Sequence, residues 1–174
     1  MLDFEAVLVT PRLYLEPLTR EHAARLFSGV QDPLLYRYYA GAPPQSLDDL
    51  VRQYAAWETR KSPDGSETWL NYAVRTKEGA YVGWVQATIR GDAATIGYDI
   101  FSPFWSRGYG SESCAELVRL LRTVQSIKSI KAVVDTENLP SIRLLEKLGF
   151  THTYTGPSED LPGRRDFHYE MPCQ

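Results

Sequence analysis

Three strand-like segments that follow one another in the middle of the chain constrain the fold most. Apolar and polar side chains alternate over residues 70–76, 81–89 and 94–101, which is the period of a β-strand. The two connections between them are each four residues long and contain a glycine and charged residues. Strands joined by such short connections pair in antiparallel fashion. The sequence therefore predicts an antiparallel meander at the centre of the molecule.

Segments with helical or strand periodicity on both sides of the meander complete a mixed sheet. A strand at residues 12–17 precedes helical segments at 19–30 and 46–54. After the meander we expect a helix at 110–124, a strand at 128–135, a helix at 138–148 followed by Gly149, and strands at 151–155 and 166–171. This order, β α α β β β α β α β β, predicts a mixed α/β sheet in a single domain of residues 1–174, with one clear parallel crossover between residues 94 and 135.

Composition and charge disfavour several classes of function. The chain has 174 residues, of which 43% are hydrophobic, and its net charge of -3 argues against nucleic acid as a partner. No window is apolar enough to span a membrane, and the first residues lack the features of a targeting signal. Only Cys114 and Cys173 are present, so we expect no disulfide framework and a cytoplasmic protein. His22, His152 and His168 have no metal-ligand spacing, which predicts that there is no metal site.

A loop with two glycines joins the last strand of the meander to the next helix. Gly108 and Gly110 allow backbone N–H groups to turn towards a ligand, and the helix behind them adds its own unpaired N–H donors. Such a helix start suits phosphate or pyrophosphate, and Arg107 could add a charge-assisted contact. A tight turn without any ligand explains the two glycines about equally well.

The same loop invites comparison with a dinucleotide-binding site. Gly108-Tyr-Gly-Ser-Glu-Ser113 has the spacing G-x-G-x-x-S, and Asp135 ends the next strand, where an acid that binds ribose could lie. The third glycine is missing, however, and six residues separate Phe101 from the first glycine. About 65 residues follow the loop, too few for the rest of a doubly wound fold. A dinucleotide-dependent oxidoreductase is therefore a minor alternative.

Motifs along the chain resemble those of the GNAT superfamily of N-acetyltransferases. The run IGYDIFSPFWSRGYGSES, residues 96–113, is similar to the acyl-CoA binding motif of the subgroup that includes the ribosomal-protein N-terminal acetyltransferases. Trp105 occupies a place that the general superfamily pattern gives to Gln or Arg, a departure shared with this subgroup. The run ENLPSIRLLEKLGF, residues 137–150, is similar to a second motif, and TPRLYLEPL, residues 10–18, resembles the first strand. The resemblance covers nearly the whole chain.

This resemblance implies acetyl-CoA as the cosubstrate and direct transfer of its acetyl group to an amine. It implies that backbone groups of Ile100 and Phe101 pair with the pantetheine arm and that the Ile100 N–H stabilises charge on the thioester carbonyl oxygen. Asn138 would bind the cofactor arm as well as cap its helix, and Arg143 would either approach a phosphate or remain solvated. The pyrophosphate would lie on the backbone of Arg107, Gly108, Tyr109, Gly110 and Ser111.

The catalytic residues are less clear from the sequence. Ser141 could give a proton to the departing thiolate, because the place of the superfamily's usual tyrosine holds Leu145; water, or an ordinary first-turn serine with no such role, is the alternative. Asp99 is the only carboxylate on its strand and is our candidate for the general base. Glu112 more simply serves the dipole of the following helix, and a water relay could replace either carboxylate.

Aromatic residues suggest where the acceptor binds. Tyr36 and Tyr39, in the connection between the first two helices, and Tyr72 and Trp84 on the meander could line a cleft for the acceptor, or could belong to the core. Such a wall suits a small-molecule amine or a protein N-terminus, in a monomer or a homodimer. A non-catalytic acyl-CoA binding module is the main alternative to an enzyme, since the helix tyrosine and a strand glutamate of the superfamily are missing.

Overall fold

The computed structural model describes residues 4–173, and its elements follow the predicted order with one addition. The addition is the short strand β1, which pairs with β2. Three 3-10 turns, η1 to η3, also occur at Arg20–His22, Pro33–Arg37 and Ser102–Phe104. The strands are β1 Leu8–Val9, β2 Leu13–Pro17, β3 Thr68–Thr76, β4 Tyr81–Arg90, β5 Ala93–Ile100, β6 Ser129–Asp135, β7 Thr151–Pro157 and β8 Arg165–Pro172, and the helices are α1 Ala23–Val30, α2 Leu47–Trp57, α3 Tyr109–Arg122 and α4 Leu139–Lys147.

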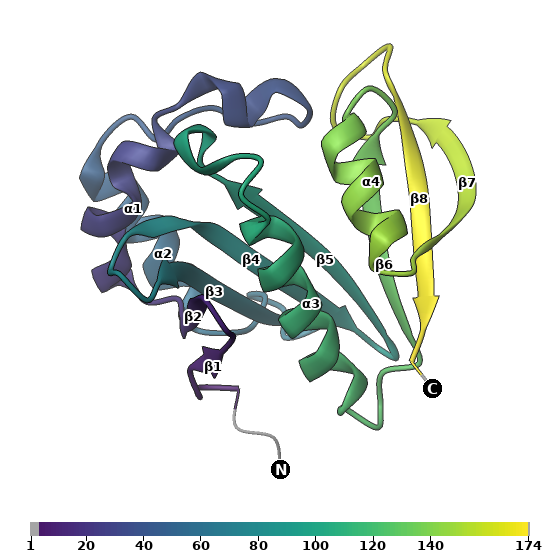
Figure 1. Cartoon of the computed structure of the whole chain (residues 1–174), viewed down its shortest axis with the longest axis horizontal. Coiled ribbons are helices and arrows are strands. Elements are labelled where there is room, and N and C mark those ends of the chain that lie inside the picture. The colour runs from purple at the N-terminus through teal and green to yellow at the C-terminus, as the bar shows by residue number, and fades with distance from the viewer. Residues whose placement is uncertain (1–3, 174) are drawn as a thin grey trace.

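The strands form one mixed sheet in the order β1-β2-β3-β4-β5-β6-β8-β7 (Figure 1). Every neighbouring pair is antiparallel except β5 and β6, which are parallel and are connected through α3. This confirms the predicted mixed α/β sheet, its central meander of β3, β4 and β5, and its crossover.

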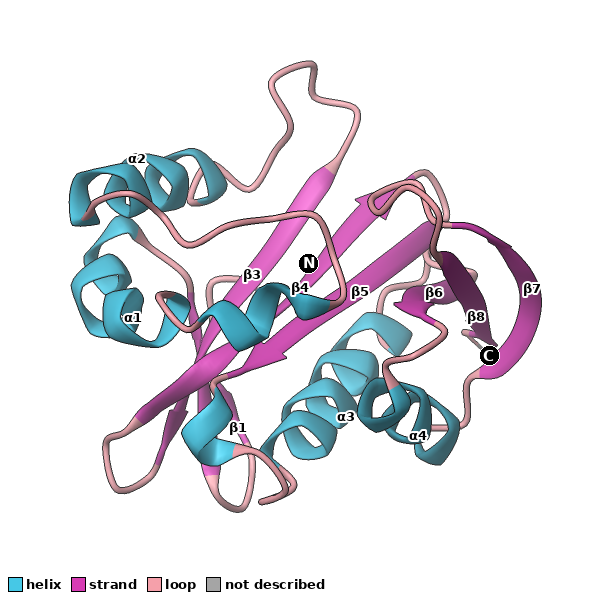
Figure 2. Ribbon diagram, turned by 90° about the horizontal axis from the view of Figure 1, so that it is seen from above, coloured by secondary structure: helices cyan, strands magenta, loops and turns pink. Residues whose placement is uncertain are grey.

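Helices cover both faces of the sheet, as the view from above shows (Figure 2). On one face, α3 and α4 bury a core that includes Leu117, Leu121 and Leu145. On the other face, α1 and α2 bury a second core that includes Leu26 and Tyr54. Each fully buried side chain of this size contributes about 1.5–3 kcal/mol through removal of apolar surface from water. β5 contributes Ala94 and Ile96 to the first core, and Phe101, the residue that follows β5, belongs to the second core.

The two parallel strands, β5 and β6, are paired over only part of their length. β5 pairs with β6 only from Ala93–Ser129 to Thr95–Lys131, although β5 continues to Ile100 and β6 to Asp135. Beyond Thr95 the two strands are no longer paired and their backbones diverge in a V (Figure 1). We call the region between the diverging backbones the V-shaped opening. Within residues 4–173, no strand pairs with β5 on that side beyond Thr95, so the β5 backbone groups there make no ladder hydrogen bonds.

Candidate active site

The glycine loop ends at the open start of α3. Ser106 and Gly108 have left-handed φ values of 60° and 80°, and Gly108 is the N-cap residue of α3 but offers no side-chain acceptor. The first N–H groups of any α-helix lack partners within the helix. Gly110 lies tightly against α4, because a Cβ there would come within 3.1 Å of the Leu144 side chain. The loop therefore presents unpaired donors at a positive helix end, which fits a phosphate group.

Ile100 directs its backbone into the V-shaped opening. The N–H of Phe101 donates to the carbonyl of Val82 on β4 at 2.9 Å. Successive residues of a strand point their N–H and C=O groups to opposite sides, so those of Ile100 point away from β4. The indole N–H of Trp105 donates to the Ile100 carbonyl, which ties the glycine loop to the end of β5. The Ile100 N–H faces the opening, as the proposed donor to a thioester carbonyl must.

The expectation that Phe101 also pairs with pantetheine is wrong. Its N–H is bonded to Val82, and its carbonyl accepts from the N–H of Phe104 at 2.9 Å. Its side chain is buried beneath α1, where a Cβ on Gly29 would lie only 2.2 Å from the ring. Phe101 therefore anchors the end of β5 to α1, and its backbone N–H is not free to pair with a cofactor.

Asp99 is mostly buried and has one hydrogen-bond donor from another element. The Tyr39 hydroxyl donates to Asp99 Oδ2 at 2.8 Å. Burial raises the pKa of Asp99 from its ordinary 3.8 to about 7, against the opposing effect of this hydrogen bond. Burial and the charge of Asp99 raise the pKa of Tyr39, so its hydroxyl remains protonated and acts as the donor. A carboxyl group with this pKa can exchange a proton at neutral pH.

Three of the four predicted acceptor residues surround Asp99. Tyr39 bonds to it, and the Tyr36 ring lies 5.6 Å from that of Tyr39. The Tyr36 hydroxyl is itself bonded to the carbonyl of Val30 at 2.8 Å. Trp84 is the cross-strand partner of Asp99 on β4, so both side chains leave the same face of the sheet. These aromatic side chains can enclose the amine end of an acceptor.

Tyr72, the fourth predicted acceptor residue, belongs to the core. Its side chain is completely buried on the face of the sheet that α3 covers, and its hydroxyl donates to the carbonyl of Phe4 at 3.3 Å. Its strand neighbour Ala73 pairs with Trp84, so Tyr72 points to the opposite face from Trp84. The prediction that Tyr72 lines the acceptor cleft is therefore wrong.

Asn138 and Ser141 lie at the start of α4. The Asn138 side chain caps the helix by accepting from the Ser141 N–H at 3.3 Å, as the sequence predicts. The hydroxyl of Tyr98, next to Asp99 but on the other face of β5, makes a long contact of 3.5 Å with the Ser141 carbonyl. Ser141 and Asp99 are thus associated with opposite faces of β5. Arg143, in the same helix, is exposed.

Sequence reasoning missed an ion pair between Arg164 and Asp135, which links the end of β6 to the connection between α1 and α2. Arg164, in the connection between β7 and β8, pairs with the fully buried Asp135 side chain, with 2.8 Å between Arg164 Nε and Asp135 Oδ2. The same guanidinium donates to the carbonyl of Arg37 at 3.1 Å and pairs with Glu137 before α4. It therefore connects the turn that carries Tyr36 and Tyr39 to the end of β6. No local pattern in the sequence signals a contact over this separation.

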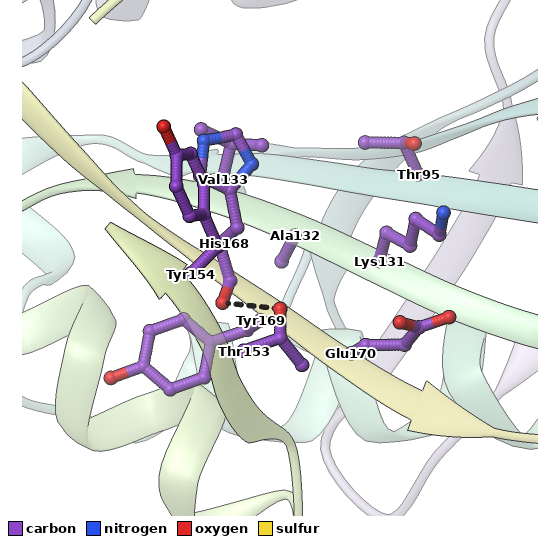
Figure 3. A pocket seen from close by; sticks show the side chains of 9 residues that line it. All are labelled: Thr95, Lys131, Ala132, Val133, Thr153, Tyr154, His168, Tyr169 and Glu170. Carbon is purple, nitrogen blue, oxygen red and sulfur yellow. Dashed lines mark hydrogen bonds between the residues drawn. The ribbon is translucent and has the colours of Figure 1, made fainter. Parts of the chain in front are cut away.

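A shallow pocket of about 260 Å³ lies elsewhere, over β6, β8 and β7 (Figure 3). Figure 3 shows Lys131, Val133, His168 and Tyr154 around it, and Val133 and Tyr154 are exposed. The pocket includes neither Asp99 nor the glycine loop, so it is separate from the candidate active site. Between residues 4 and 173, no group of three or more His, Cys, Asp or Glu side chains could hold a metal ion. No helix of that same range is long and apolar enough to cross a membrane.

The sheet, its opening between parallel strands and the glycine loop beside it define an acyl-CoA-dependent transferase. Residues 12–151 match the family described as the acetyltransferase (GNAT) domain. The chain belongs to this family and is an acetyl-CoA-dependent N-acetyltransferase. The predicted superfamily is thereby confirmed, and the family leaves no basis for the dinucleotide alternative.

Similar proteins agree with this assignment. FsC-acetyl coenzyme A-N(2)-transacetylase of Aspergillus fumigatus is 28% identical over 163 residues, which are 87% of this chain and 67% of that protein. The uncharacterized N-acetyltransferase YoaA of Bacillus subtilis is 28% identical over 145 residues, 83% of this chain and 82% of that protein. Among solved structures, the ribosomal L7/L12 alpha-N-protein acetyltransferase RimL in complex with coenzyme A has a TM-score of 0.83 at 16% identity, covering 96% of this chain and 98% of that one. The two folds therefore agree over nearly the whole length of both chains.

Proposed function

We propose that this chain acetylates a primary amine, either a small-molecule amine or a protein N-terminus, at the V-shaped opening between β5 and β6. The observation that carries the proposal is the adjacency of two groups on β5. The Asp99 carboxyl group has its pKa raised to about 7, and the next residue, Ile100, turns its N–H into the opening. A proton acceptor and a donor to the thioester carbonyl thus come from consecutive residues of one strand.

The cofactor site follows the edge of the opening towards α3. The backbone N–H groups of residues 107–111 hold the diphosphate of acetyl-CoA, helped by the positive end of the helix. Arg107 is exposed and adds charge there, and Arg143 does the same from α4. The Asn138 side chain caps α4 and contacts the pantetheine arm. Acetyl-CoA supplies the activated acetyl group, and these residues bind and orient it.

The proposed reaction forms a bond between the amine nitrogen and the acetyl carbon while the bond from that carbon to sulfur breaks. Asp99 accepts the proton that the ammonium group must lose. The Ile100 N–H stabilises the negative charge that develops on the carbonyl oxygen, a contribution worth about 3 kcal/mol for a comparable donor. CoA leaves as the thiolate and receives a proton from Ser141. The nitrogen, which becomes positively charged when its bond to the acetyl carbon forms, gives up a second proton that passes through solvent to restore Ser141, and Asp99 releases the first proton to solvent after the reaction.

The acceptor site is the aromatic wall around Asp99. Tyr36, Tyr39 and Trp84 present ring faces that attract a cationic amine and exclude water from the carboxylate. The turn that carries the tyrosines is held in place by Arg164. This wall selects a positively charged amino group next to apolar atoms, which both classes of acceptor possess.

Release of CoA thiol in the presence of acetyl-CoA and a panel of amines tests the proposal. The panel contains aliphatic amines, aromatic amines and short peptides with free N-termini. We expect saturable thiol release with at least one of these classes and a matching acetylated product by mass spectrometry. Binding of CoA without turnover over the whole panel would favour the non-catalytic alternative instead.

We also place the reaction in the cytoplasm. Cys114 is buried in the core, and both it and Cys173 are free thiols. Unpaired cysteines are typical of a reducing compartment such as the cytoplasm.

A further inference from the structure

Glu112, in the first turn of α3, is bound by the segment that enters β2. Its Oε1 accepts from the Thr10 hydroxyl at 2.6 Å and from the Arg12 backbone N–H at 2.9 Å. Its Oε2 accepts from Arg12 Nε at 2.6 Å. Partial burial alone would raise the pKa of Glu112, but these hydrogen bonds outweigh it and hold the pKa below its ordinary value. Glu112 therefore does more than serve the helix dipole, because it attaches the start of α3 to a segment 100 positions away.

The other edge of the Arg12 guanidinium reaches the glycine loop. Arg12 Nη1 donates to the carbonyl of Arg107 at 2.9 Å, and the guanidinium carbon lies 4.9 Å from the centre of the Tyr109 ring. Arg12 Nη2 lies 3.2 Å from the place of a Cβ on Gly108. Arg12 thus contacts Arg107 and Tyr109 and lies beside Gly108, which is between them. Its Nε and Nη1 are already used in hydrogen bonds within the protein.

The bond to the Arg107 carbonyl fixes the direction of the next N–H. In a trans peptide the C=O and the following N–H point in opposite directions. With the Arg107 carbonyl directed at Arg12, the Gly108 N–H must point away from Arg12. Glycine at position 108, with φ at 80°, can adopt many other conformations at little energetic expense, so the loop alone does not select this one.

We propose that Arg12 is a positioning residue for the diphosphate half of acetyl-CoA: it holds the 107–108 peptide and the start of α3 so that their N–H groups face the cofactor. The inference rests on the cofactor site proposed above. Arg12 acts through Arg107 and Glu112 and does not itself touch the cofactor. Thr10 supports it by donating a hydrogen bond to Glu112 Oε1, while Arg12 Nε binds Oε2.

The inference predicts a defect confined to ligands that carry the diphosphate. In Arg12→Ala we expect the dissociation constant for CoA, measured by calorimetry, to rise about tenfold, as for the loss of a pair of charge-assisted hydrogen bonds. The KM for acetyl-CoA should rise by a similar factor with little change in kcat. The KM for S-acetylpantetheine, which lacks the diphosphate, should stay the same. Arg12→Lys should resemble Arg12→Ala, since an ammonium group cannot bind Glu112 and Arg107 in a fork.

Arg20→Ala is the matched control, because Arg20 forms an exposed ion pair with Glu58 and takes no part in the glycine loop. Arg20→Ala also removes one positive charge, and it should leave the dissociation constant for CoA and the KM values for acetyl-CoA and S-acetylpantetheine unchanged. If Arg12→Ala fails to fold, Arg12→Lys carries the test. Equal losses for acetyl-CoA and S-acetylpantetheine, or no loss for either, would overturn the role of Arg12. Failure of the unmodified protein to bind CoA would overturn the proposed cofactor site itself, and the role of Arg12 with it.

Discussion

The Tyr39 hydroxyl donates a 2.8 Å hydrogen bond to the carboxylate of Asp99, and so joins the connection between α1 and α2 to the edge of the V-shaped opening. This bond holds the candidate base in one orientation. It also favours the ionised form of Asp99, whereas burial favours the neutral form. The balance of these two effects places the pKa where an amine acetyltransferase needs it.

Tyr39→Phe should move the pH dependence of the reaction upwards. The substitution removes the hydrogen bond that lowers the pKa of Asp99 and leaves burial unopposed. Because the reaction requires the carboxylate, kcat/KM should rise with pH with a midpoint above that of the unmodified enzyme. A pH profile of kcat/KM from pH 5.5 to 9 measures the shift. An unchanged or lower midpoint would show that this hydrogen bond does not control Asp99.

Asp99→Asn should stabilise the protein by an amount that grows as pH rises. The folded pKa of Asp99, about 7, lies above its ordinary value of 3.8, so stability contributed by the protonated form is present at low pH and is lost as pH rises towards 7. Asparagine has no charge to bury and can still accept from Tyr39. The free energy of unfolding of the variant in urea should therefore exceed that of the unmodified protein by an amount that increases from pH 4.5 to about pH 7 and then levels off. A constant difference over this range would contradict the raised pKa.

Gly29→Ala should destabilise the protein through Phe101. A Cβ on residue 29 would lie 2.2 Å from the Phe101 ring, which cannot move freely because it is buried between α1 and the sheet. Overpacking of this kind typically costs about 1–3 kcal/mol. Urea unfolding measures the loss, and Phe101→Leu in the same background should recover part of it. Full stability of Gly29→Ala would mean that α1 does not pack as closely as described.

Arg164→Ala should destabilise the protein, because it leaves the buried carboxylate of Asp135 without its ion-pair partner. The Asp135 side chain is fully buried and pairs with Arg164, so removal of the guanidinium leaves a poorly compensated charge, at about 3 kcal/mol. Asp135→Asn in the Arg164→Ala background removes that charge and should restore much of the stability. The double variant should still show a higher KM for the acceptor, because Arg164 also holds the Arg37 carbonyl. No recovery in the double variant would argue against this account.

The sequence predicted the fold well because periodicity and turn lengths are local. It missed β1, since Leu8–Val9 is too short to show alternation and is defined only by its pairing with β2. Its two errors in the site concern the direction in which a residue points. Ile100 and Phe101 are consecutive, so only one of them can turn its N–H into the opening, and which one depends on the register with β4. Tyr72 was misplaced because the sequence does not show which helices cover which face.

The contacts that sequence reasoning missed are all between distant segments. Arg12 and Glu112 are 100 positions apart, and Tyr39 and Asp99 are 60 apart. The sequence had drawn attention to all four residues, but for separate reasons and not as pairs. Their association follows from the sheet order, which brings the first strands and the α1–α2 connection to the same end of β5 as the glycine loop.

Acetyl transfer by the unmodified enzyme and by Asp99→Asn, compared across pH 6 to 9, tests the central claim most directly. The assay follows CoA thiol and acetylated amine together, with the best acceptor from the panel. The account predicts equal amounts of both products, a rate for the unmodified enzyme that rises with a midpoint near pH 7, and a rate for Asp99→Asn that is at least 100-fold lower at pH 8, as for loss of a general base. Full activity of Asp99→Asn at every pH would contradict it.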